Sequence, residues 1–213
     1  MLRRDSLCLM FGVFAGLIHL ALSFGLGALL PGYDPIHQTI SEIGERGSPF
    51  EATFKALSFI GTICLIVFSY GVCRFSLKRH LSPIPALFLG FYGLMELGVA
   101  IFESPHPLHN VFGISTTVGF FAPMALALAW PRGPDYRVLR QVSVAAAVLL
   151  IIGIVLNLMP LFSQPAYLLE HYGLVQRAHF VLFYLWCAYL AVTLLLRLRP
   201  RALSGAVADL GSR

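Results

Sequence analysis

The sequence predicts an all-α fold, an integral membrane bundle of six transmembrane helices. The chain has 213 residues, of which 58% are hydrophobic and only 12% are charged, and its mean hydropathy is +0.80. A soluble domain has roughly twice that charged fraction. Six apolar stretches are long enough to cross the hydrocarbon core, which takes about 20 helical residues. None shows the alternating segments of about 10 residues that are typical of a membrane barrel.

The six predicted helices cover residues 7–30, 53–73, 83–103, 109–130, 139–162 and 171–196. They form a single transmembrane domain, residues 1–199, and residues 200–213 are predicted to be a flexible cytoplasmic tail. The first apolar stretch follows two arginines, as in a signal peptide, but it is longer than a typical h-region and has no clear cleavage site. We therefore expect an uncleaved first helix.

The distribution of basic residues predicts the orientation. Twelve of the 15 Lys and Arg residues lie near the two termini or in the connections after the second and fourth helices. Because cytoplasmic segments are rich in Lys and Arg, both termini are predicted to lie inside. The same bias accounts for the net charge of +5, which therefore does not indicate binding of nucleic acid. The expected partners are membrane lipid and, to enlarge a small bundle, a second copy in a homodimer.

The first outer connection, residues 31–52, is long and polar, and it predicts a short amphipathic surface helix. Asp34 is a good N-cap, Pro35 suits the first helical position, and Gly44 suits the end. The apolar stripe of this helix consists of Ile36, Ile40 and Ile43. Such a helix would lie in the membrane interface. This helix would either contribute residues to a functional site or only cover the outer end of the bundle.

Histidines and acids gather at the predicted outer ends of the helices, which carry five of the seven histidines. Histidine and carboxylate together suit metal binding or proton transfer. The candidate catalytic residues of this rim are Asp34, His37, Ser41, Glu42, Glu103 and His109.

The segment from Glu103 to His109 has the highest local density of potential ligands. We predict that His106, His109 and His179 are the candidate metal ligands, with a divalent transition metal such as zinc as the cofactor. The spacing matches no standard zinc signature. The alternative is that these imidazoles cap a helix and bond to loop carbonyls.

Three further residues are candidates for substrate binding. Arg177 lies inside the last helix, where an arginine is costly unless it is paired. Its guanidinium would hold a phosphate or a carboxylate, or would form a structural salt bridge. Tyr92 and Asn157 are the other two candidates, on the third and fifth helices.

Two ionisable residues, His19 and Glu96, lie at a similar depth near the middle of their helices. Ionisable groups at this depth are candidates for function. The pair would act as a proton relay, or it would fix helix packing through an interhelical hydrogen bond.

The run from Pro31 to Gly44, with Tyr-Asp-Pro followed by Ile-Ser-Glu-Ile-Gly, comes after a first membrane helix, and an outer His109 follows the third. This pattern resembles a family of prokaryotic membrane proteins, domain of unknown function 998. The resemblance covers the six-helix layout. It implies a multi-pass protein of the cytoplasmic (inner) membrane, and it implies no established activity.

The residue types of the rim are also similar to those of alkaline ceramidases and progestin-receptor-like membrane hydrolases, which hold a zinc with three histidines. Two features differ. That family has seven helices, and its last helix carries two histidines four positions apart, whereas His171 and His179 are eight apart. The similarity is an analogy in residue types.

Three functions compete at this point. The first is a metal-dependent hydrolase that acts on a lipid or amphiphile at the outer face. The second is a proton-coupled transporter or binding protein for a small molecule, which would use His19 and Glu96. The third is a non-catalytic membrane partner or sensor that docks through its outer loop.

Overall fold

The computed structural model describes residues 2–163 and 165–198, and this part of the chain is helical with no strand. Six helices are long and apolar enough to span a membrane, which confirms the predicted fold class. The predicted tail, 200–213, lies outside the described residues. The segments that build the spans are α1 (Leu2–Leu20), η1 (Ala21–Leu26), α2 (Gly27–Leu29), α4 (Glu51–Lys78), α5 (Ile84–Ile101), α6 (Pro107–Ser115), η2 (Thr116–Phe121), α7 (Ala122–Ala129), η3 (Pro134–Tyr136), α8 (Arg137–Leu158), η4 (Met159–Leu161) and α10 (Tyr172–Leu198).

The fourth span changes from α-helix to 3-10 helix and back. Thr116 and Thr117 donate their hydroxyls to the carbonyls of Gly113 and Ile114, at 2.6 and 2.7 Å. Pro123, in the first turn of α7, has no N–H with which to continue a ladder. Competition from side-chain hydrogen bonds and the missing donor together account for the tighter turn at η2.

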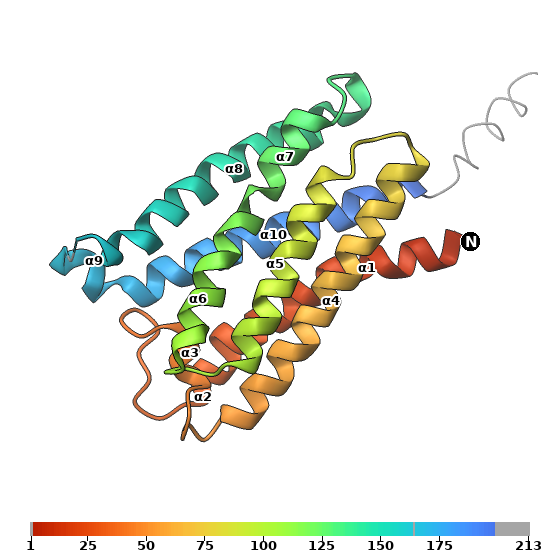
Figure 1. Cartoon of the computed structure of the whole chain (residues 1–213). Coiled ribbons are helices and arrows are strands. Elements are labelled where there is room, and N and C mark those ends of the chain that lie inside the picture. The colour runs from red at the N-terminus through yellow and green to blue at the C-terminus, as the bar shows by residue number, and fades with distance from the viewer. Residues whose placement is uncertain (1, 164, 199–213) are drawn as a thin grey trace, which may run out of the picture.

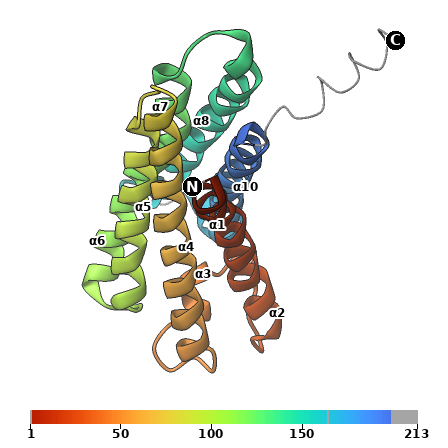
Figure 2. The ribbon, with the colours of Figure 1, turned by 90° about the vertical axis from the view of Figure 1, so that its right-hand side faces the viewer.

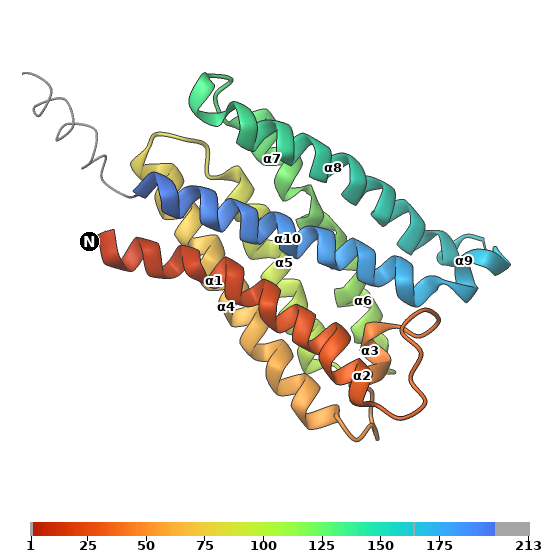
Figure 3. The same ribbon diagram turned by 180° about the vertical axis from the view of Figure 1, so that it is seen from behind.

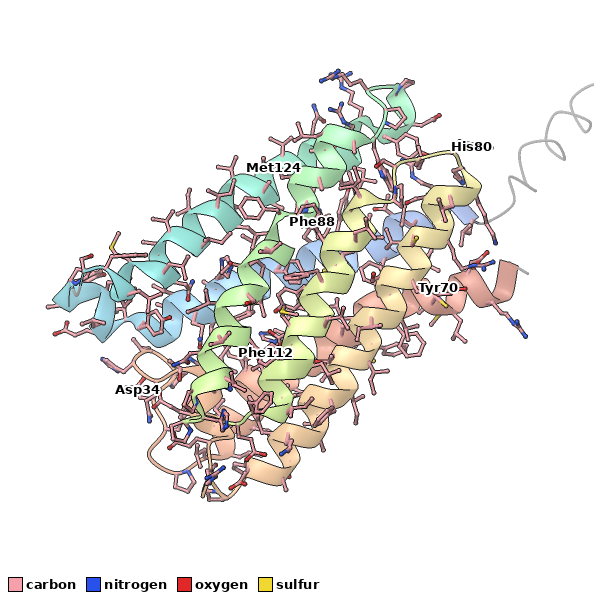
Figure 4. All side chains as sticks on the ribbon, in the orientation of Figure 1. Asp34, Tyr70, His80, Phe88, Phe112 and Met124 are labelled. Carbon is pink, nitrogen blue, oxygen red and sulfur yellow. The ribbon has the colours of Figure 1, made fainter. Side chains whose placement is uncertain are left out.

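The spans form a ring in chain order, in which each packs on the next and α10 closes back onto α1 (Figures 1 and 2). We call the end with the connections 79–83 and 130–136 the basic end, and the end with the connections 30–50, 102–106 and 162–171 the loop end. Asp34 and His80 mark these opposite ends in Figure 4. Toward the loop end α8 and α10 diverge from α6, which packs mainly on α5 (Figures 1 and 3).

The half of the bundle next to the basic end holds the apolar core. Small residues allow close approach there: a Cβ on Gly71 would meet Cys8 at 2.9 Å, and one on Gly12 would meet Phe68 at 2.8 Å. Asp5 is buried and forms salt bridges with Arg74 and Lys78. The large core side chains here are Leu9, Phe68, Val72, Phe75, Leu89, Leu126, Trp130, Leu139, Leu190 and Leu194.

The surface helix in the first connection is shorter than predicted. It is α3 (Ile40–Ile43), one turn long, and its N-cap is Thr39 rather than Asp34. The Glu42 carboxylate accepts hydrogen bonds from the backbone N–H and the hydroxyl of Thr39, at 2.8 and 2.7 Å. Because Thr39 is extended, with ψ of 160°, the turn at Asp34 cannot continue into α3, so Ile36 stays exposed and only Ile40 and Ile43 are buried.

Candidate functional site: a polar cavity at the loop end

A cavity of about 360 Å³ occupies the loop half of the bundle and receives side chains from all six spans. Its volume lies at the lower end of the range for ligand sites, about 300–1,000 Å³. Aliphatic and aromatic side chains form much of the wall. The polar residues in the wall are His19, Thr39, Ser41, Lys55, Ser58, Glu96, Glu103, Ser104, His109, Asn110, Thr116, Thr117, Asn157, Tyr172, Gln176 and His179.

The deepest ionisable side chains, His19, Glu96 and His179, come from three spans, and we call them the floor. The His19 ring stacks on Tyr184 with centroids 4.4 Å apart, and its Nε2 lies 3.1 Å from the Ser23 hydroxyl. Among the hydrogen bonds and salt bridges of the described residues, none joins His19 to Glu96. The two predicted partners therefore share the cavity without forming a pair.

His179 is the least satisfied polar group of the cavity. Its side chain is buried, at 5% exposure, and neither ring nitrogen has a hydrogen-bond partner within the described part of the chain. Its ring meets Phe120 edge to face, with centroids 4.1 Å apart. A Cβ on Gly153 would lie 1.9 Å from Nδ1, so the imidazole fits against α8 only because position 153 has no side chain. A neutral imidazole offers one donor and one acceptor.

The roof of the cavity is the segment 31–46, and Arg177 holds it in place. The guanidinium is buried, at 2% exposure, and Nη1 donates to the carbonyls of Pro35 and Gln38, at 2.9 and 2.7 Å. Nη2 donates to the Tyr33 hydroxyl, and burial raises the pKa of Tyr33. Since Arg177 does not line the cavity and carbonyls occupy its donors, its geometry favours a structural role over the predicted anion binding.

The backbone of the roof also docks on α10. Leu174 donates its N–H to the Ile36 carbonyl, at 3.0 Å, and the Gln176 side chain accepts from the Ile40 N–H, at 2.8 Å. A Cβ on Gly173 would lie 2.2 Å from the Gln38 carbonyl oxygen, so this helix position needs glycine for the roof to come close. The roof is a fixed part of the fold at this end.

Glu103 lies in the cavity wall and forms a salt bridge with Lys55. The hydrogen bond from Lys55 lowers the pKa of Glu103 below its ordinary value. His109 is nearby in the wall, and its Nδ1 lies 2.8 Å from the Phe102 carbonyl oxygen. Both predicted residues thus reach the cavity, each with an internal partner already in place.

The three predicted metal ligands do not come together. His106 accepts the Leu108 N–H at the start of α6 and does not line the cavity, while His109 bonds to a loop carbonyl and His179 lies on the floor. Among residues 2–163 and 165–198, no group of three or more His, Cys, Asp or Glu side chains is placed to hold a metal ion. His106 and His109 therefore bond to backbone groups near the start of α6 and do not point toward a common metal position.

The other predicted catalytic residues divide between the roof surface and the cavity. Asp34 and His37 form an exposed pair, at 2.8 Å, and hydrogen bonds from the Ile36 N–H and from His37 lower the pKa of Asp34. Ser41 lines the cavity, with its hydroxyl 3.1 Å from that of Thr39. No hydrogen bond in the described part of the chain links Ser41 to a histidine.

The two remaining substrate-binding candidates differ in position. Asn157 lines the cavity and donates to the Gly153 carbonyl, at 2.8 Å. Tyr92 is fully buried in the core behind the floor, where its hydroxyl lies close to Glu96 and Tyr184 but makes no hydrogen bond of normal geometry. Only Asn157 is placed to touch a ligand directly.

Sequence reasoning missed three features of the site. Lys55 and Gln176 are ordinary polar residues near helix ends, and nothing in the sequence indicates that they reach a cavity. The third feature is the π-helical segment η1, in which Ser23 accepts from Arg177 through its carbonyl, at 3.4 Å. Gly153 and Asn157 lie one turn apart in an otherwise apolar helix. This spacing was the signal in the sequence that could have predicted that this face of α8 lines a cavity.

Comparison with known proteins identifies the family and nothing finer. No curated protein and no solved structure matches the chain. The model of one family, described as "Protein of unknown function (DUF998)", matches residues 13–193, which include part or all of each span and every residue that lines the cavity. The chain therefore belongs to the DUF998 family of multi-pass membrane proteins.

Proposed function

We propose that this protein is a membrane-embedded binding protein that takes up a small amphiphilic molecule at the outer face. The observation that carries the proposal is the cavity, which connects the loop end to the polar floor. The lining supports it further, because a few polar side chains at the floor of a largely apolar wall are typical of a ligand site. The concentration of Lys and Arg in the sequence near the termini and around the connections 79–83 and 130–136 supports placing the loop end outside.

The hydrolase hypothesis lacks the parts it needs. Its metal would require a cluster of ligands, which the described residues do not form. Among the same residues, no histidine bonds to the candidate catalytic residue Ser41. A transporter would have to open the packed core of the basic half, so the geometry supports binding more directly than transport. The homodimer remains a prediction.

A pair of matched glycine variants tests the proposal. A Cβ at Gly113, which lines the cavity, or at Gly25, which does not, would meet no atom within 4 Å. Gly113→Phe would fill the cavity, whereas Gly25→Phe would add the same ring on the outside. Native mass spectrometry in mild detergent, followed by thermal-shift screening of amphiphiles, measures what each protein binds.

We expect the wild type and Gly25→Phe to bind the same compound and Gly113→Phe to lose it. The absence of any bound or stabilising compound from the wild type would overturn the proposal. Equal binding by all three proteins would also overturn it, because the compound would then sit elsewhere.

A further inference from the structure

Glu96 is an acid in the cavity without an ionic partner. The four salt bridges among the described residues use the carboxylates of Asp5, Asp34 and Glu103, and none uses Glu96. An unpaired charge is costly at this depth, and intramembrane acids face cavities or partners. A ligand that brings a positive charge would therefore find in Glu96 an acid with no cationic partner among the described residues.

The two cations nearest the cavity are already engaged. Lys55 is paired with Glu103, and Arg177 is surrounded by carbonyl oxygens and the Tyr33 hydroxyl. Neither cation forms a hydrogen bond or a salt bridge with Glu96 in the described part of the chain. Glu96 is therefore the acid of the floor with which a second positive charge can pair.

Aromatic rings of the cavity wall pack against the histidines of the floor, Phe120 against His179 and Phe180 against His19. Phe120 and Phe180 line the cavity with ring centroids 5.7 Å apart. The faces of such rings attract ammonium groups, with a contribution of about 0.5–2 kcal/mol. A cavity that combines an acid with aromatic rings is a recognition surface for an amine rather than for an anion.

The flank of the cavity indicates where an apolar tail would lie. Ile114 on α6 and Leu161 on η4 both line the cavity, and they are also 44% and 61% exposed on the molecule. They lie on the two segments that diverge toward the loop end (Figures 1 and 3). A cavity of about 360 Å³ can hold a polar head and a few methylenes, so a longer chain would extend between α6 and α8 into the bilayer.

From these observations we infer that the ligand is a lipophilic amine, whose ammonium pairs with Glu96 and whose alkyl chain leaves between α6 and α8. The inference rests on the proposed binding function and specifies the charge and shape of the ligand.

Three probes of equal chain length test it on the full chain in lipid nanodiscs: octylamine, octanol and octanoate. We expect octylamine to bind at least ten-fold more tightly than the other two at pH 7. In Glu96→Gln the affinity for octylamine should fall to that for octanol, and the affinity for octanol should stay unchanged. Glu45→Gln, the same change at an exposed position of the roof, should leave all three affinities unchanged.

Glu96→Asp keeps the charge and guards against a folding defect in Glu96→Gln, and it should retain a preference for the amine. Ile114→Trp should weaken octylamine but not butylamine, because it obstructs only the exit of the tail. Equal affinity of the wild type for octylamine and octanol would overturn the inference and leave the binding function standing. If no probe of any charge binds and no compound stabilises the wild type, both fail.

Discussion

The two halves of the bundle place their ionisable side chains differently. In the basic half, the charged side chains stay at the rim, where Asp5 meets Arg74 and Lys78. The buried hydroxyls of Ser69, Ser76 and Ser143 all have hydrogen-bond partners. Between them the interior is filled by aliphatic and aromatic side chains. In the loop half, the polar side chains lie inside and enclose a cavity.

The difference supports placing the proposed ligand site in the loop half. A filled interior contributes packing and leaves no room for a ligand. A cavity with buried polar groups forgoes packing, and evolution tolerates that loss where a ligand restores the missing contacts. His179 is the clearest case, since it lacks hydrogen-bond partners in the described structure although it is buried.

The largest expected effect comes from Arg177→Ala, which tests whether the loop half depends on one anchor. The change leaves the carbonyls of Ser23, Pro35 and Gln38 without their donor, so we expect a loss of about 4 kcal/mol in the free energy of unfolding. Hydrogen exchange followed by mass spectrometry should show fast exchange in the roof, 31–46, and unchanged protection in the basic half of α4.

Arg46→Ala is the matched control, because Arg46 belongs to the same segment but is exposed. It should leave exchange in the roof unaltered. Slow exchange of the roof in Arg177→Ala would show that the docking of Leu174 and Gln176 suffices, and the two halves would then be less different than we argue.

Gly153→Ala sharpens the comparison at the floor. The new methyl group would lie 1.9 Å from Nδ1 of His179 and displace the ring, so we expect a loss of about 2 kcal/mol through overpacking. Thermal unfolding in detergent measures it. Gly113 lines the same cavity, and a methyl group there would meet no atom within 4 Å. Gly113→Ala should therefore leave the free energy of unfolding unchanged.

The double variant Gly153→Ala/His179→Ala completes a thermodynamic cycle. It should recover most of the loss, because the methyl group then occupies space that the imidazole has left. Additive losses in the double variant would mean that the two positions do not meet, and the described placement of His179 would be wrong.

The smallest effect concerns pH at the salt bridge between Glu103 and Lys55. The pKa of Glu103 is lowered in the folded protein, so the pair stabilises above the ordinary glutamate pKa of about 4.3 and is lost as the pH falls through the folded pKa. Because Lys55 is 40% exposed, we expect less than about 1 kcal/mol.

Melting temperatures at pH 3.5 and pH 7 measure the contribution of this salt bridge to stability. The acid-induced drop should be smaller in Glu103→Gln than in the wild type, and Glu45→Gln should resemble the wild type. A drop of equal size in all three proteins would assign the acid sensitivity to other carboxylates, such as Asp34.

The end of the bundle that holds the site was predictable from the sequence, but the hydrogen bonds and salt bridges within the site were not. The sequence placed Ser41, Glu103 and His109 at the same end as the cavity, and all three line it. It also paired His19 with Glu96 by depth, yet depth leaves the rotation of each helix open, and the two side chains meet other groups. The predicted metal cluster is absent from the described residues because His106 and His109 bond instead to the backbone of Leu108 and Phe102.

The sequence by itself determined the six spans, the all-helical class and the gathering of polar residues at one end. These properties depend on hydropathy along the chain, which requires no knowledge of neighbours. The tertiary structure alone decided that Arg177 is bound by carbonyls more than 130 positions away and that Gly153 leaves room for His179. Such contacts depend on how helices rotate and cross, and packing sets these only after the chain has folded.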